Sequence, residues 1–174
     1  MVGFDTTFLT WLFVRTAKHR VPNAKERVEY LISELSGRGD QIVIPTPALS
    51  ELLIKTGVAT SKILDEIKGN PRFIIAPFDL LAAIELALFS DATLSKADKR
   101  QGSTAIWSKV KFDRQIVAIC KVLRTSCIYS DDGDVKATGK REGMPVYGVE
   151  DIHFPDKLGA EETFRLTSPP SRNT

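Results

Sequence analysis

Residues 1–9, MVGFDTTFL, join a short apolar segment to the start of a helix. Met1 to Asp5 has the character of a buried β-strand, and Thr6 or Thr7 is suited to cap the following helix. The same strand-then-helix pattern recurs along the chain. Further strand patterns are QIVIP (41–45), RFIIAP (72–77), SCIYS (126–130) and MPVYGV (144–149). Strands that alternate with helices predict an α/β fold, a three-layer α/β/α sandwich around a parallel sheet of about five strands.

The composition fits a soluble globular domain, because 43% of the 174 residues are hydrophobic and 26% are charged. Residues 1–149 are expected to form one domain. Residues 150–174, rich in Pro, Asp, Ser and Thr, are expected to form an extended or partly disordered extension. A net charge of +2 excludes a strong basic field over the whole surface. Without a long apolar run or an export signal, we expect a cytoplasmic protein without membrane association and with Cys120 as a buried thiol.

Four acidic residues fall where this topology would bring them together: Asp5, Glu51, Asp113 and Asp132. Asp5 ends the first strand, Glu51 lies one turn into a helix that follows a strand, and Asp132 follows the strand 126–130. Ligands of open α/β sheets bind beyond the carboxyl ends of the strands. Carboxylates gathered at that edge repel each other unless a cation compensates them, which predicts a divalent metal site.

Asp113 opens the amphipathic run DRQIVAICKVL (113–123). Because Ile116, Val117 and Cys120 stand three, four and seven residues later, the Asp113 carboxylate is predicted to share the inward stripe of this helix. An aspartate at such a position is costly unless it is paired, caps the helix or binds a cation.

Each acid also has a purely structural interpretation. Asp5 and Asp113 can serve as helix N-caps, and Glu51 can face solvent as most glutamates do. The stretch SDDGD (130–134) can simply provide turn geometry. The metal interpretation rests on all four acids falling at one edge of the sheet.

A site of this kind suits Mg²⁺ or Mn²⁺, which prefer carboxylate and water oxygens. Such an ion lowers the pKa of a bound water and stabilises charge on a phosphate oxygen, so it favours phosphodiester hydrolysis. The sequence has no cysteine–histidine spacing typical of zinc, and the GxGxxG and GKS/T phosphate loops are absent.

At this point the ordered set of motifs resembles the PIN-domain family, in particular VapC-type toxin ribonucleases and stand-alone bacterial PIN proteins. The resemblance spans residues 1–149. It is carried by FDTT (4–7), TPALSELL (46–53), DRQIVAICKV (113–122) and IYSDDGD (128–134). It implies a five-stranded parallel sheet between helices and Mg²⁺- or Mn²⁺-dependent RNA cleavage.

The resemblance also implies roles for individual residues. Asp5, Glu51 and Asp113 would be the core metal ligands, Asp132 the fourth catalytic acid and Asp134 a further acidic ligand. Three residues would have supporting roles. Ser130 takes the place of a family threonine, Thr6 matches a small polar residue that supports the metal-bound water, and Asp131 lies beside the fourth acid, so the register there is open by one residue.

Basic residues near the proposed site are candidates for contacts with RNA phosphates: Lys109, Lys111, Arg114 and Lys136. For each of them an ordinary solvated surface position is the alternative. The apolar helices 7–14 and 25–35 carry more hydrophobic residues than one face of a sheet is expected to bury. That surplus would suit a homodimer or an antitoxin-type peptide.

The sequence thus predicts a metal-dependent ribonuclease, with the toxin of a toxin–antitoxin pair as one role. Two alternatives remain. The first is a non-catalytic PIN-like binding module. The second is a haloacid-dehalogenase-like phosphatase, since FDTT follows an apolar strand. That family needs a second aspartate two residues after the nucleophile, and Thr7 occupies this place.

Overall fold

The structure is a computed structural model that describes residues 1–14, 21–94 and 107–153, without the side chains of 90–94 and 107–109. Its strands are short. They are β1 (Val2–Phe4), β2 (Ile42–Pro45), β3 (Phe73–Ala76), β4 (Ile128–Tyr129) and β5 (Val146–Tyr147). All neighbouring pairs are parallel, in the order β3-β2-β1-β4-β5. The predicted α/β fold with a five-stranded parallel sheet is confirmed.

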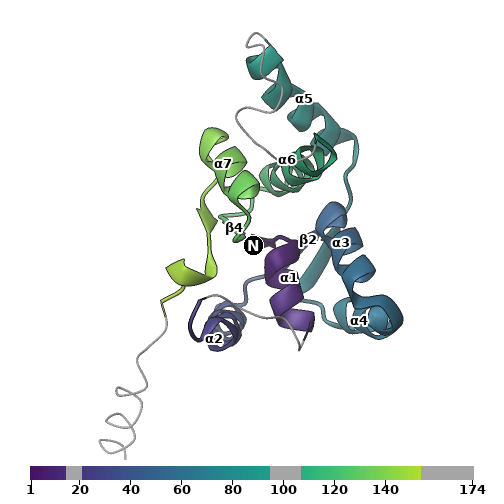
Figure 1. Cartoon of the computed structure of the whole chain (residues 1–174), viewed down its shortest axis with the longest axis vertical. Coiled ribbons are helices and arrows are strands. Elements are labelled where there is room, and N and C mark those ends of the chain that lie inside the picture. Colours follow the sequence, from purple (N-terminus) through teal and green to yellow (C-terminus); the bar gives the residue numbers. More distant parts are fainter. Residues whose placement is uncertain (15–20, 95–106, 154–174) are drawn as a thin grey trace, which may run out of the picture.

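Helices cover both faces of this sheet (Figure 1). The first face carries α1 (Thr6–Phe13), α2 (Ala24–Gly37), α3 (Thr46–Thr56), the short 3-10 helix η1 (Gly57–Ala59) and α4 (Thr60–Gly69). The opposite face carries α5 (Leu80–Leu94), α6 (Trp107–Val122) and α7 (Gly133–Arg141). A second 3-10 helix, η2 (Val149–Asp151), follows β5. The three layers are therefore those that the sequence predicted.

The core lies where the apolar faces of the helices meet the strands. On the first face it includes the fully buried Phe4, Phe8 and Leu52. On the second face Cys120 of α6 lies directly over Gly3 of β1, and a Cβ at Gly3 would stand 2.5 Å from the Cys120 Sγ. Burial raises the pKa of the Cys120 thiol to about 12, so it stays protonated and acts as a packing residue.

The start of α6 differs from the sequence-based expectation. Helix α6 begins at Trp107, so Asp113 lies in the helix interior, and the interpretation of Asp113 as an N-cap is wrong. The reason is that Val110, three residues earlier, is also buried and extends the inward stripe towards the N-terminus.

The chain after β5 contributes to the core. Val149 is fully buried and Ile152 is 6% exposed, and both belong to the cluster of buried residues on the first face. Arg27 of α2 donates from Nη1 to the Ile152 carbonyl at 2.5 Å. The packed part of the domain therefore continues through Ile152. Of the extension expected over residues 150–174, residues 154–174 lie outside the described residues.

The described exposed surface has its large apolar side chains on other helices than expected. On α1 and α2, Phe8, Leu9, Val28 and Leu31 are buried, because both helices pack on the sheet. Most of the exposed large apolar side chains are instead on α5 (Leu80, Leu81, Ile84 and Leu88) and on α3 and η1 (Ile54 and Val58). In the described ranges, no helix is both long enough and apolar enough to cross a membrane.

Candidate metal centre

The candidate site lies at the carboxyl ends of β1, β4 and β5. Gly3 and Phe4 pair in register with Ile128 and Tyr129, and Tyr129 pairs with Tyr147. The next residues of these strands, Asp5, Ser130 and Gly148, therefore lie side by side. The strands that follow β1 in sequence, β2 and β3, lie on one side of it, whereas β4 and β5 lie on the other side. The carboxyl ends of β1 and β4 therefore form the topological switch point, where open α/β sheets bind ligands.

Three aspartates converge beside this point. Asp113, Asp132 and Asp134 each place a carboxylate oxygen so that all three oxygens lie within 4.8 Å of one another. Asp113 reaches the cluster from the inward stripe of α6, where it is 5% exposed. Asp132 is the N-cap of α7, and its Oδ1 accepts from the N–H groups of Asp134 and Val135 at 2.8 and 3.4 Å. The helix N-terminus thus holds Asp132 in place through the N–H groups of its own first turn.

This spacing fits a small divalent ion. Oxygens bound to Mg²⁺ at about 2.1 Å in an octahedron lie about 3 Å apart when adjacent and about 4 Å apart when opposite. Oxygens within 4.8 Å need only a small inward movement to reach that arrangement. Two ionised carboxylates at this distance repel by about 3 kcal/mol at an effective dielectric of about 20, less where solvent screens them. The cluster therefore has the donor atoms that a hard divalent cation prefers.

Asp5 follows β1 and is the N-cap of α1, one of the two interpretations that the sequence offered for it. Its Oδ1 accepts from the N–H groups of Thr7 and Phe8 and from the Thr7 hydroxyl, so it caps α1. Its Oδ2 accepts a short hydrogen bond from the Ser130 hydroxyl. The side chain is only 2% exposed, and burial raises its pKa to about 6, although these hydrogen bonds act in the opposite direction.

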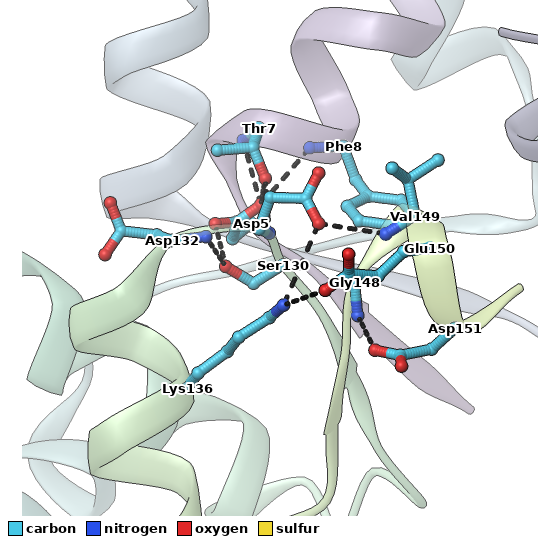
Figure 2. A network of polar contacts seen from close by, with 11 residues as sticks. Asp5, Thr7, Phe8, Ser130, Asp132, Lys136, Gly148, Val149, Glu150 and Asp151 are labelled. Carbon is cyan, nitrogen blue, oxygen red and sulfur yellow. Dashed lines mark hydrogen bonds and ion pairs between the residues drawn. The ribbon is translucent and has the colours of Figure 1, made fainter. Parts of the chain in front are cut away.

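Two hydroxyl groups connect Asp5 to the loop that carries the cluster (Figure 2). The Ser130 hydroxyl donates to Asp5 and accepts from the Asp132 N–H at 3.0 Å. The Thr7 hydroxyl donates to Asp5 at 2.6 Å and accepts from the Asp131 N–H at 3.0 Å. Asp5 therefore sets the position of the β4–α7 loop through two single-atom bridges.

Glu51 of α3 is held by the residue next to Asp5. The Thr6 hydroxyl donates to Glu51 Oε2 at 2.8 Å, so Glu51 is half-buried and not a simple solvent-facing side chain. In the part of the chain that the structure describes, neither Asp5 nor Glu51 belongs to the cluster of three carboxylates. Both have hydrogen-bond donors of their own, and their role as metal ligands stays a prediction.

The carboxylates of Asp131 and Asp132 contact different groups. Its Oδ1 accepts from the Val149 N–H at 2.9 Å and lies 4.0 Å from the Lys136 Nζ. Burial raises the pKa of Asp131, while the Val149 N–H and the Lys136 charge act against this shift. Among the described residues, Asp132 and Asp134 lie in one cluster with Asp113, and Asp131 does not. The assignment of Asp132 as the fourth acid stays a prediction.

The four basic residues predicted to contact RNA have different surroundings. Lys111 is exposed on α6, as such a contact requires, whereas Arg114 is only 6% exposed. Arg114 follows Asp113 on the inward side of the helix, so the prediction that it forms an RNA-binding surface does not fit its burial. Lys136 lies within 4.0 Å of two carboxylates, and the Lys109 side chain is outside the described residues.

Sequence reasoning missed Thr7 and Gly148. Thr7 bridges Asp5 and Asp131, a role that its place two residues after a capping aspartate could have indicated. Gly148 lets the chain pass close to the loop, since a Cβ there would stand 2.5 Å from Asp131 Oδ1 and 2.6 Å from Lys136 Nζ. In the sequence this glycine has no signal beyond its place at the end of a strand.

Together, the sheet order and the acidic cluster define an α/β protein with a PIN-like fold and a candidate divalent-metal centre at its switch point. Among solved structures, the chain is similar to the Mycobacterium tuberculosis toxin VapC20, described as cleaving the sarcin–ricin loop. The two share 15% identity with a TM-score of 0.53, over 80% of this chain and 95% of that one. No family model and no curated protein matches the sequence. The likeness to VapC20 shows the fold.

Proposed function

We propose that this chain is a Mg²⁺- or Mn²⁺-dependent ribonuclease. The observation that carries the proposal is the convergence of Asp113, Asp132 and Asp134 at the switch point of a PIN-like sheet. These three carboxylates are the proposed metal ligands. Asp5 and Glu51 are proposed to complete the acidic site from β1 and α3, as ligands or by holding metal-bound water.

When bound, such an ion would lower the pKa of a water molecule and stabilise negative charge on the phosphate that is cleaved. The residues of the chain supply the geometry. Asp113 is held by α6, Asp132 by the first turn of α7, and Ser130 connects that turn to Asp5. Hydrolysis adds one water across a phosphorus–oxygen bond of the RNA backbone. Lys111 is the exposed cation on α6 that is proposed to contact a neighbouring phosphate.

The phosphatase alternative is disfavoured by the surroundings of Asp5. A nucleophilic aspartate needs a carboxylate oxygen that can reach the substrate phosphorus. Both oxygens of Asp5 accept hydrogen bonds, and the side chain is 2% exposed. Thr7, at the position of the required general acid, donates its hydroxyl proton to Asp5 instead.

We also propose a protein partner for this chain. The partner is either an antitoxin peptide, which would make the chain a toxin, or a second copy of the chain in a homodimer. The feature that supports a partner is the row of exposed apolar side chains on α5, where Leu81, Ile84 and Leu88 follow each other at helical spacing. Light scattering of the purified chain tests the homodimer. A monomer at micromolar concentration that purifies without a bound peptide would contradict both partners.

The test of the nuclease is cleavage of a structured RNA with Mg²⁺ or Mn²⁺. We expect Asp113→Asn and Asp134→Asn to lower the rate by about 100-fold or more, since each removes a charge that holds the ion. Asp65→Asn, at an exposed position on α4, is the matched control and should keep full activity. Thermal unfolding of each variant verifies that it is folded.

Full cleavage by Asp113→Asn, or by the wild type in excess EDTA, would contradict the proposal. Binding of Mn²⁺ without cleavage of any RNA would favour the non-catalytic module. Turnover of small phosphomonoesters would favour the phosphatase.

A further inference from the structure

Asp131 and Lys136 connect the turn that carries Asp132 and Asp134 to residues 148–152, which follow β5. Asp131 Oδ1 accepts from the Val149 N–H at 2.9 Å, and Lys136 Nζ lies 4.0 Å from the same oxygen. Lys136 also lies 3.9 Å from Glu150 Oε1. Figure 2 shows Lys136 reaching from α7 towards Gly148 and Glu150, with the Asp132 carboxylate directed away from them.

Residues 148–152, which Asp131 and Lys136 contact, are held in place by the core and by hydrogen bonds. Val149 is fully buried, Ile152 is 6% exposed, and the Ile152 carbonyl accepts from Arg27 Nη1. The Gly148 N–H donates to Asp151 Oδ2 at 2.7 Å, which fixes the turn into η2. Residues 148–152 therefore form a support that is held by α2 and the core, independently of the acidic cluster.

Asp131 and Lys136 are also linked directly to Asp132, a member of the acidic cluster. Asp131 precedes Asp132, and Lys136 lies on α7 one turn after Asp132, whose carbonyl accepts the Lys136 N–H at 3.0 Å. The Asp131 N–H donates to Thr7, which in turn donates to Asp5. Asp131 therefore makes contacts on both sides of the loop, through its backbone to β1 and α1 and through its carboxylate to residues after β5.

We propose that Asp131 and Lys136 are positioning residues, which fix the first turn of α7 against residues 148–152 and so place Asp132 and Asp134 for metal binding. This inference rests on the proposed metal-dependent function. With the Asp131 carboxylate removed, the loop keeps its hydroxyl bridges to Asp5 but loses its contact with Val149. Asp132 and Asp134 then lose one of the contacts that fix their position relative to Asp113 on α6.

The experiment is calorimetric titration of the full chain with Mn²⁺, together with RNA cleavage as a function of Mn²⁺. We expect Asp131→Ala to raise the Mn²⁺ dissociation constant by about 10- to 100-fold, as loss of an outer partner of a metal ligand does. Saturating Mn²⁺ should restore kcat to within about threefold of the wild type. Asp131→Asn keeps an oxygen for the Val149 N–H and should recover most of the affinity. A merely structural role would not produce this split.

Matched control variants distinguish a loss of positioning from a general destabilisation of the fold. Lys136→Met should weaken Mn²⁺ binding, whereas Lys140→Met, the same change at an exposed position one turn later, should not. Gly148→Ala places a methyl group against Asp131 and Lys136 and should also weaken Mn²⁺ binding, while Gly69→Ala, which meets no neighbouring atom, is its control.

The possible failures are distinguishable. A wild type that does not bind Mn²⁺ would overturn the proposed function and this inference together. Wild-type binding with an unchanged dissociation constant in Asp131→Ala would overturn the positioning role alone. Complete loss of binding in both Asp131→Ala and Asp131→Asn, as expected for a direct ligand, would also overturn it.

Discussion

Replacing Asp5 by asparagine should stabilise the protein when no metal is present. In the folded chain, burial raises the pKa of Asp5 from 3.8 to about 6. At neutral pH the carboxylate is ionised in both states, so folding moves its charge out of water. A shift of roughly two pKa units corresponds to about 3 kcal/mol at pH values above both pKa values.

Asparagine removes this charge and keeps most of the local structure. Its carbonyl oxygen can still accept from the N–H groups of Thr7 and Phe8, and asparagine is among the best N-cap residues. It weakens the hydrogen bond from Ser130, at a cost of about 1 kcal/mol. We therefore expect Asp5→Asn to raise the free energy of unfolding by about 1 to 2 kcal/mol in EDTA at about pH 7.5.

The pH dependence of the free energy of unfolding gives an independent prediction, because its direction follows from the raised pKa of Asp5. Because the folded protein holds the Asp5 proton to higher pH than the unfolded chain, this group favours folding most below its unfolded pKa of 3.8. That contribution is lost as pH rises towards about 6. Between about pH 5 and about pH 7.5 the wild type should lose about 1 kcal/mol relative to Asp5→Asn.

Urea denaturation of both proteins in EDTA at the two pH values measures this difference. A variant that is less stable than the wild type at the higher pH, with the same pH dependence, would refute the reasoning. Adding Mn²⁺ at about 100 times its dissociation constant should raise the free energy of unfolding of the wild type by about 2.7 kcal/mol.

Three further predictions concern the surroundings of the site. Ser130→Ala leaves the buried Asp5 Oδ2 without its donor and should lower the free energy of unfolding by about 1 to 3 kcal/mol, measured by urea denaturation; an unchanged value would show that Asp5 does not need this donor. Gly3→Ala should cost a similar amount, about 1 to 3 kcal/mol, and Cys120→Ala in the same chain should recover most of it, because the added Cβ would meet the Cys120 Sγ at 2.5 Å; no recovery would contradict this packing. Ile84→Ser, at a side chain that is 50% exposed, should change stability by less than about 0.5 kcal/mol; a loss well above this would indicate that α5 is buried in an oligomer.

The fold could be predicted because its signals are local. Each strand is a short apolar run. The first three runs are each followed by a helix pattern with a recognisable start or stop, such as Asp79, whose Oδ1 accepts from the Ala82 N–H in α5. The exception is the start of α6. The polar residues of WSKVKF (107–112) conceal a helical turn, although Val110 continues the stripe of Asp113 and Val117.

The candidate site could be predicted as a set of acids but not as a geometry. The position of Asp113 three residues before Ile116 indicated correctly that it points inward. The sequence could not show that Asp134 would join the cluster while Asp5 would cap α1. That choice depends on the register of β1 against β4, which places Ser130 beside Asp5.

The separation of Asp131 from Asp132 also required three dimensions. Neighbouring aspartates in a turn rich in Asp and Gly have the same local signal. Their roles differ because Asp132 caps α7, whereas the Asp131 carboxylate meets the N–H of Val149, which is 18 residues further along the chain.

The most direct test of the metal centre is a crystal of the full chain grown with Mn²⁺ and measured for anomalous scattering. We predict one strong peak that lies about 2.1 to 2.2 Å from a carboxylate oxygen of each of Asp113, Asp132 and Asp134. A saturating concentration of Mn²⁺ that leaves no peak among these three carboxylates, or places it at a different group of residues, would contradict the account.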